Sequence, residues 1–75
     1  MNKVRRKAIE KIADRLIELE MEFETLYDEE SDYLDNIPEN LQSGERYEMV
    51  EDTVFQMEQI FMVMRSTYED LMELC

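Results

Sequence analysis

The fold is decided by residues 47–75, which read YEMVEDTVFQMEQIFMVMRSTYEDLMELC. Apolar side chains recur in this stretch at alternating spacings of three and four residues, at Tyr47, Val50, Val54, Met57, Phe61, Met64, Tyr68, Leu71 and Cys75. This heptad pattern makes one side of an α-helix apolar and is typical of coiled coils and helical bundles. Ile60, Val63 and Leu74 widen the apolar stripe, as expected of a bundle helix. We therefore expect a helix over about residues 45–74.

The first half of the chain has the same pattern. Its apolar stripe consists of Ile9, Ile12, Leu16, Leu19, Phe23 and Leu26, followed after a polar interruption by Tyr33 and Ile37. Ala13, Ile17 and Tyr27 flank this stripe. The residue before a proline disfavours helical geometry, so Pro38 limits the helix at its C-terminal end. We expect the first helix over about residues 3–35.

The connection over about residues 36–44 is expected to be structured. Pro38 fits the first position of a short helical turn. Ile37 and Leu41 are apolar and can cover the open end of a core between the two helices. Ser43 is the expected N-cap of the second helix, because its hydroxyl can accept a bond from a free backbone N–H.

The net charge of −12 is unevenly distributed along the chain. Residues 1–15 carry six cations and two carboxylates, a net charge of +4, and the remainder carries −16. Cations at the start of a helix and acids at its end both oppose the helix dipole, and an antiparallel pair places them side by side. We therefore expect a single all-α domain over residues 1–75, an antiparallel helical hairpin. A contact of the basic stretch Lys3–Arg15 with phosphate or a membrane is the alternative use of these charges.

A hairpin of two helices buries only one stripe on each helix. Ordering 75 residues costs about 110 kcal/mol at roughly 1.5 kcal/mol per residue, which a two-helix contact does not comfortably offset. We expect a homodimer that forms an antiparallel four-helix bundle, and a bundle with a different partner protein is the alternative. The expected self-association residues are Leu16, Leu19, Phe23, Val54, Met57, Phe61 and Met64.

The composition excludes several kinds of chemistry. The chain has no His and one Cys, Cys75, so it lacks imidazole catalysis, a thiolate zinc site and the Glu-x-x-His motif of di-iron bundles. Glu45-x-x-Glu48 and Glu48-x-x-Glu51 superficially match the motifs of all-helical, magnesium-dependent nucleotide pyrophosphatases. This spacing is nearly unavoidable in a chain with 20 acidic residues. We expect no enzyme activity, no metal and no cofactor.

The outer side of the second helix combines carboxylates with two apolar residues, Phe55 and Met62. An apolar pair surrounded by carboxylates fits a basic protein surface that has an apolar anchor, whereas scattered surface hydrophobics are the plain alternative. The expected partner-binding residues are Glu48, Glu51, Phe55, Glu58, Met62, Glu69 and Glu73. An acidic surface of this kind repels nucleic acid, so we expect no direct nucleic-acid binding.

Residues 32–48, DYLDNIPENLQSGERYE, resemble the connection of small acidic proteins from phages and mobile elements of Gram-positive bacteria. In that family the connection has an aromatic residue, Asn, an aliphatic residue, Pro, Glu, Asn or Ser, Leu, and then Ser-x-Glu-Arg before an acidic helix. The family is largely uncharacterised. The resemblance implies a helical hairpin of viral or mobile-element origin, and by analogy an inhibitor of a host protein.

Together these observations predict a non-enzymatic interaction protein. We expect an acidic phage or mobile-element inhibitor that binds a basic surface of a host nucleic-acid-handling or defence protein. A structural protein that only oligomerises is the alternative, and a metal-dependent pyrophosphatase is a third. No apolar run approaches the roughly 20 residues of a membrane span, and residues 1–11 lack the apolar core of a signal peptide. We therefore expect a cytoplasmic location in a bacterial cell and no membrane contact.

Overall fold

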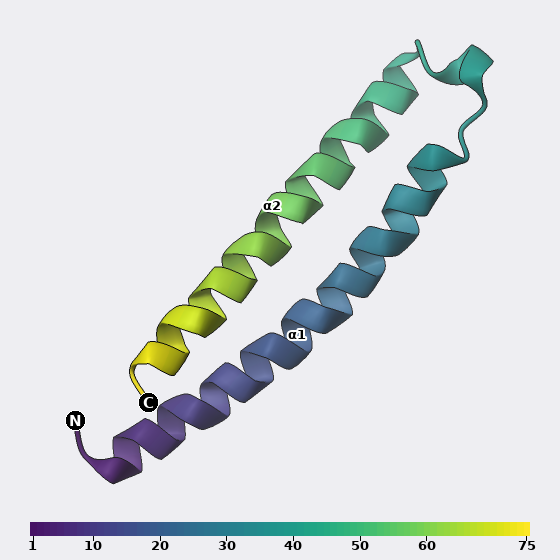
Figure 1. The fold of residues 1–75 in the computed structure, drawn as a ribbon. Coiled ribbons are helices and arrows are strands. Elements are labelled where there is room, and N and C mark those ends of the chain that lie inside the picture. Colours follow the sequence, from purple (N-terminus) through teal and green to yellow (C-terminus); the bar gives the residue numbers. More distant parts are fainter.

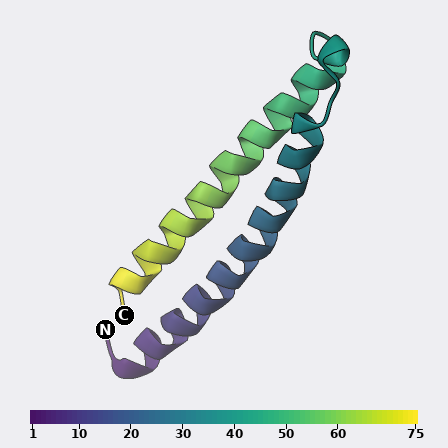
Figure 2. The ribbon, with the colours of Figure 1, turned by 45° about the vertical axis from the view of Figure 1, so that its right-hand side comes forward.

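The computed structural model describes all 75 residues as two long helices joined by a short connection. Helix α1 spans Lys3–Asp35, a 3-10 turn η1 spans Glu39–Leu41, and helix α2 spans Glu45–Glu73. The helices run antiparallel, side by side along most of their length, with the chain termini together at the end opposite η1 (Figures 1 and 2). The prediction of an all-α helical hairpin is confirmed. The molecule measures 60 × 14 × 12 Å, so it is a rod one hairpin thick.

Local hydrogen bonds set the limits of α1. The Asn2 side chain accepts a bond of 2.9 Å from the backbone N–H of Arg5, which caps the first turn. At the other end, the side chain and backbone N–H of Asn36 both donate to the carbonyl of Asp32, at 2.8 and 3.1 Å. The sequence Ile37-Pro38 then takes the chain out of helical geometry.

The connection leads into α2 without a side-chain cap. Pro38 precedes η1, and the Gln42 amide donates to the Ile37 carbonyl at 3.1 Å. The expectation that Ser43 caps α2 is wrong, because the N-cap is Gly44, with φ −85° and ψ 160°. The Gly44 N–H bonds to the Leu41 carbonyl at 3.3 Å, so the turn continues past Ser43 before the helix begins.

The core is a line of contacts between the two helices. Ala13, Glu20 and Val54 are the three buried residues. The Tyr27 and Phe61 rings pack edge to face across the hairpin, with centroids 4.9 Å apart. Helix α2 uses the expected side, since its apolar stripe residues from Tyr47 to Leu71 are buried or half-buried.

Helix α1 contacts α2 along a row of residues beside its main apolar stripe. The contact runs along Ala13, Glu20 and Tyr27, while members of the expected stripe lie outside it and are exposed: Ile12, Leu19, Leu26 and Tyr33. The apolar surface of α1 is therefore divided between the contact with α2 and an exposed part. The apolar surface of α1 is wider than one partner helix can cover, and the small Ala13 and the Glu20 ion pair described below occupy the contact.

The charged ends of the hairpin lie together without pairing directly. The Cys75 thiol is 3.7 Å from the Arg6 carbonyl, so the end of α2 lies beside the basic start of α1. No ion pair joins that basic stretch to Glu69, Asp70 or Glu73, because both ion pairs of the structure involve Arg65. The basic start of α1 and the acidic end of α2 therefore lie close together without forming an ion pair.

Candidate functional site

We call the predicted partner-binding residues of α2, from Glu48 to Glu73, the acidic face. Glu48, Phe55, Met62 and Glu69 are spaced seven residues apart, so they form one row along the helix. All four are exposed, and Glu51 and Glu73 are exposed as well. The row therefore presents two apolar side chains between carboxylates on the outside of the rod.

Glu58 is the exception within the acidic face. It is half-buried, whereas we expected it to point away from the contact with α1. Its position, seven residues before Arg65, places it at the edge of the interface between the helices. Glu58 therefore belongs to the border of the acidic face and is the least accessible of its carboxylates.

Arg65 joins the two helices at this same edge. One of its terminal nitrogens lies 3.2 Å from Glu20 Oε1 and 3.0 Å from Glu24 Oε2. The Glu20 side chain is fully buried and has no other partner in the structure, while Arg65 is half-exposed. A buried carboxylate deprived of its cation is strongly destabilising, so this cluster holds the middle of the hairpin together.

This cluster was not predicted from the sequence. Glu20 lies one position outside the expected apolar stripe. Two signals pointed to it: Glu20 lies seven residues from both Ala13 and Tyr27, and Arg65 is the one cation in residues 47–75. A lone cation amid many carboxylates is a natural partner for one that is buried.

The opposite side of the hairpin is apolar. We call this surface the apolar flank, and it consists of Ile12, Leu16, Leu19, Phe23 and Leu26 of α1 with Ile60, Met64 and Leu71 of α2. A groove of about 510 Å³ runs between the helices here, lined in part by Leu16, Leu19 and Leu71. A second hollow of about 290 Å³ lies at Ile60 and Met64. The flank is therefore a largely apolar surface with two hollows that the hairpin itself leaves open.

The predicted self-association residues divide between the helix contact and this flank. Val54 is buried between the helices, and Phe61 packs on Tyr27. Leu19 is exposed on the flank, and Leu16, Phe23 and Met64 are half-buried members of it. Met57, outside the flank, is also half-buried. The structure therefore leaves part of the predicted set available for a second molecule and uses part of it within one chain.

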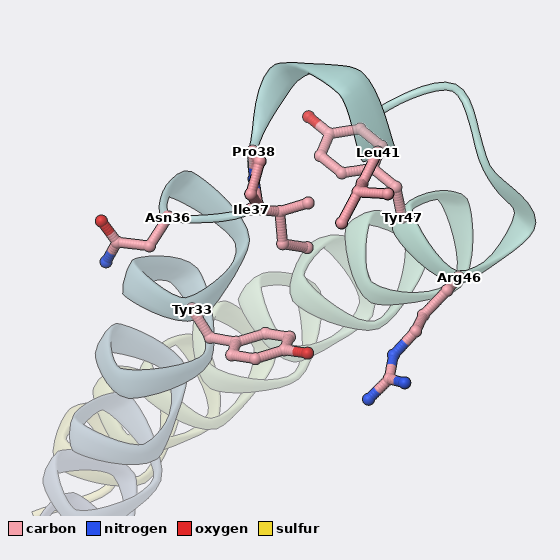
Figure 3. A pocket seen from close by; sticks show the side chains of 7 residues that line it. All are labelled: Tyr33, Asn36, Ile37, Pro38, Leu41, Arg46 and Tyr47. Carbon is pink, nitrogen blue, oxygen red and sulfur yellow. The ribbon is translucent and has the colours of Figure 1, made fainter.

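The connection encloses a third hollow, of about 400 Å³ (Figure 3). Tyr33 and Tyr47 contribute rings from the two helices, and Ile37 and Leu41 line it from the connection. Arg46 lies at its edge, with the guanidinium directed away from Leu41 and Tyr47 in this view. Ile37 is half-buried, but Leu41 is exposed, so the expected apolar cap over the end of the core is incomplete.

The acidic side chains do not gather into a metal-binding cluster. No group of three or more His, Cys, Asp or Glu side chains is placed to hold a metal ion. Glu45, Glu48 and Glu51 are exposed along the start of α2. The candidate functional features of the molecule are therefore the acidic face, the apolar flank with its groove, and the Arg65 ion-pair cluster.

Comparison with protein-family models, with curated proteins and with solved structures gave no match. Neither helix contains an apolar stretch long enough to cross a membrane. The function is therefore inferred from the surfaces of the hairpin.

Proposed function

We propose that this protein is a non-enzymatic interaction protein whose acidic face binds a basic surface of another protein. The observation that carries the proposal is the row of Phe55 and Met62, exposed by 62% and 52%, between Glu48 and Glu69. Interfaces obtain much of their binding energy from a few apolar anchors that a polar rim shields from water. Carboxylates around such anchors attract a partner of opposite charge and orient it.

The proposed partner is a nucleic-acid-handling or defence protein of a bacterial host. A protein that binds nucleic acid presents Lys and Arg to the phosphate backbone, and the same side chains complement an acidic face. The resemblance of residues 32–48 to small phage and mobile-element proteins supports this choice of partner. In this proposal the protein acts in the bacterial cytoplasm and inhibits its partner by covering the basic surface.

Reversal of charge on the acidic face tests the proposal. Changing Glu48, Glu51 and Glu69 to Lys should abolish binding to a partner captured from host lysate and then purified, because all three side chains are exposed. Glu58 is left intact because it is half-buried. The binding constant of the unaltered chain should also weaken with added salt, since exposed charges are screened over about 8 Å at physiological ionic strength.

A matched control separates this effect from loss of net charge. Changing Glu18, Asp28 and Asp32 to Lys makes the same change in total charge on exposed positions of α1. This variant should retain most of the binding. Equal binding by both triple variants, with helical spectra like that of the unaltered chain, would refute the role of the acidic face.

A second candidate function is assembly, and the apolar flank favours it. We propose that two chains pack through this flank as a homodimer, which forms an antiparallel four-helix bundle. Only three of 75 residues are buried in the single hairpin, and exposed apolar surface of this extent marks an association site. If assembly is the sole activity, changes on the acidic face will be silent and only changes on the apolar flank or in the core will matter.

A further inference from the structure

The charge on the hairpin differs between its two ends. Residues 28–52, at the end that carries the connection, hold ten carboxylates and one cation, a net charge of −9. At the other end, residues 3–15 carry +4 and residues 65–75 carry −2. The basic start of α1 and the end of α2 lie together there, so this end has a net charge of +2 (Figure 1). The rod is therefore strongly acidic at one end and weakly basic at the other.

A symmetric dimer through the apolar flank has two possible arrangements. Most homodimers have a twofold axis, and two flat rods packed face to face can have it along or across their length. An axis along the rods puts both connections at the same end. The acidic end of one copy, with a net charge of −9, then lies against the equally acidic end of the second copy. An axis across the rods puts the connections at opposite ends, with each acidic end against the basic end of the second copy. Charge complementarity favours the second arrangement.

Two unpaired charged residues on the flank fit that arrangement. Arg15 lines the groove beside Ile12 and Leu16 and makes no ion pair within the chain. Glu30 lies seven residues after Phe23, on the same side of α1; it is half-buried and also makes no ion pair. The Glu30 carboxylate is not a buried unsatisfied group, so it is free to accept a cation from outside the chain.

The positions of Arg15 and Glu30 along α1 fit a twofold axis that runs across the rods. With the axis across the rods, α1 lies antiparallel on α1 of the second copy. The exposed row of Ile12, Leu19 and Leu26 continues one step past the flank to Tyr33, and its midpoint lies between Glu22 and Phe23. Arg15 and Glu30 lie at equal distances on either side of that midpoint, so each lies level with the other residue of the second copy. The Arg15–Glu30 pair therefore occurs twice by symmetry, once on each side of the axis.

We infer that the occupant of the apolar flank is a second copy of this chain, packed with its connection at the opposite end and held by two Arg15–Glu30 ion pairs between the copies. This inference depends on the proposed homodimer and specifies its arrangement. It also leaves the acidic faces of both copies exposed on the outside of the bundle.

The native Cys75 provides a direct test of the arrangement. It is the single cysteine and is exposed at the end opposite the connection. Cys75 lies about 20 Å beyond the midpoint of the flank, at 1.5 Å per residue, so spin labels on the two Cys75 thiols should be about 40 Å apart. In the other arrangement, with both connections at the same end, the two labels would lie within about 20 Å of each other. This is twice the distance between the axes of two packed helices. Pulsed electron paramagnetic resonance distinguishes the two values.

A mixed dimer supplies the complementary measurement. Asn40→Cys combined with Cys75→Ser moves the label to the connection, which is exposed. Mixing this chain with the Cys75-labelled chain should give a short distance between the two labels. Short Cys75 distances in the unaltered dimer, or a long distance in the mixed dimer, would overturn the inferred arrangement but not the dimer. A monomer in light scattering at micromolar concentration would instead refute the dimer itself.

Charge exchange tests the Arg15–Glu30 pairs. Arg15→Glu and Glu30→Arg should each weaken dimerisation by about tenfold, because each creates two like-charge contacts between the copies. The double variant restores opposite charges and should return the dissociation constant to within about threefold of the original. Lys11→Glu is the control: Lys11 lies with Lys7, Glu10 and Asp14 away from the groove, and its reversal should have little effect. A double variant as weak as the two single variants combined would overturn the pairing.

Discussion

The apolar flank and the acidic face expose similar apolar side chains in different surroundings. Leu19 and Ile60 of the flank are exposed by 54% and 48%, and Phe55 and Met62 of the acidic face by 62% and 52%. Neighbours of Leu19 on the flank are apolar, whereas Phe55 and Met62 stand between carboxylates. The difference teaches that exposure alone does not define a site: a continuous apolar surface favours association, and apolar residues isolated among charges favour recognition of a charged partner.

The largest expected effect comes from removing the cation at the edge of the acidic face. Arg65→Met leaves the fully buried Glu20 without its partner and should lower the free energy of unfolding by about 3 kcal/mol. Urea unfolding followed by circular dichroism, at fixed protein concentration, measures this change. Adding Glu20→Leu should recover most of the loss, because the buried charge is then absent. A stable Arg65→Met variant would show that the ion pair does not hold the helices together.

Single alanine substitutions should have a smaller effect and distinguish the apolar flank from the acidic face. Leu19→Ala should raise the dimer dissociation constant by about tenfold, or roughly 1.4 kcal/mol, because the side chain is covered by the second copy. Phe55→Ala removes a larger side chain of similar exposure and should leave dimerisation unchanged while weakening partner binding. Analytical ultracentrifugation and a binding assay on both variants provide the comparison. Equal dimerisation of the two variants would remove the distinction between the surfaces.

The smallest expected effect comes from a position on neither surface. Gly44→Ser should stabilise the hairpin by a few tenths of a kcal/mol, because α2 has no side-chain cap and serine supplies one. The backbone φ of −85° suits any residue, and an added Cβ would lie 3.5 Å from the Leu41 carbonyl oxygen, an ordinary contact. Thermal melting detects the change. Neither dimerisation nor partner binding should respond, so a response would show that the connection participates in one of the interfaces.

The hairpin was predictable because its signals are local and repeated. Periodic apolar residues on either side of Pro38 predict two helices and a connection, and the structure confirms that architecture. The side of α1 that meets α2 was not predictable in the same way. Two adjacent apolar rows, such as Ile12 and Ala13, fit the same periodicity, and the choice between them depends on close packing and on the distant Arg65. The Gly44 cap depends on how η1 ends, which a search for capping residue types does not reveal.

The candidate surfaces were predictable to different degrees. The exposed row of Phe55 and Met62 follows from helical spacing, and both residues are exposed in the structure. Glu58 was misjudged because a helical projection does not indicate where the interface ends. The apolar flank was predicted only in part: Leu16, Leu19, Phe23 and Met64 were expected at a self-association surface, but the extent of that surface depends on which row of α1 the contact with α2 uses. The partner of the acidic face stays a prediction.

The burial of Glu20 has a consequence for the alignment of the two helices. Apolar stripes of similar residues would pack almost equally well if α2 slid along α1 by one helical turn, about 5.4 Å. Such a slide would carry the Arg65 guanidinium away from Glu20 and leave a buried carboxylate uncompensated, at a cost of about 3 kcal/mol or more. The Arg65–Glu20 ion pair therefore favours the observed alignment over one displaced by a turn. By fixing the helix stagger, it also fixes where the two halves of the apolar flank meet.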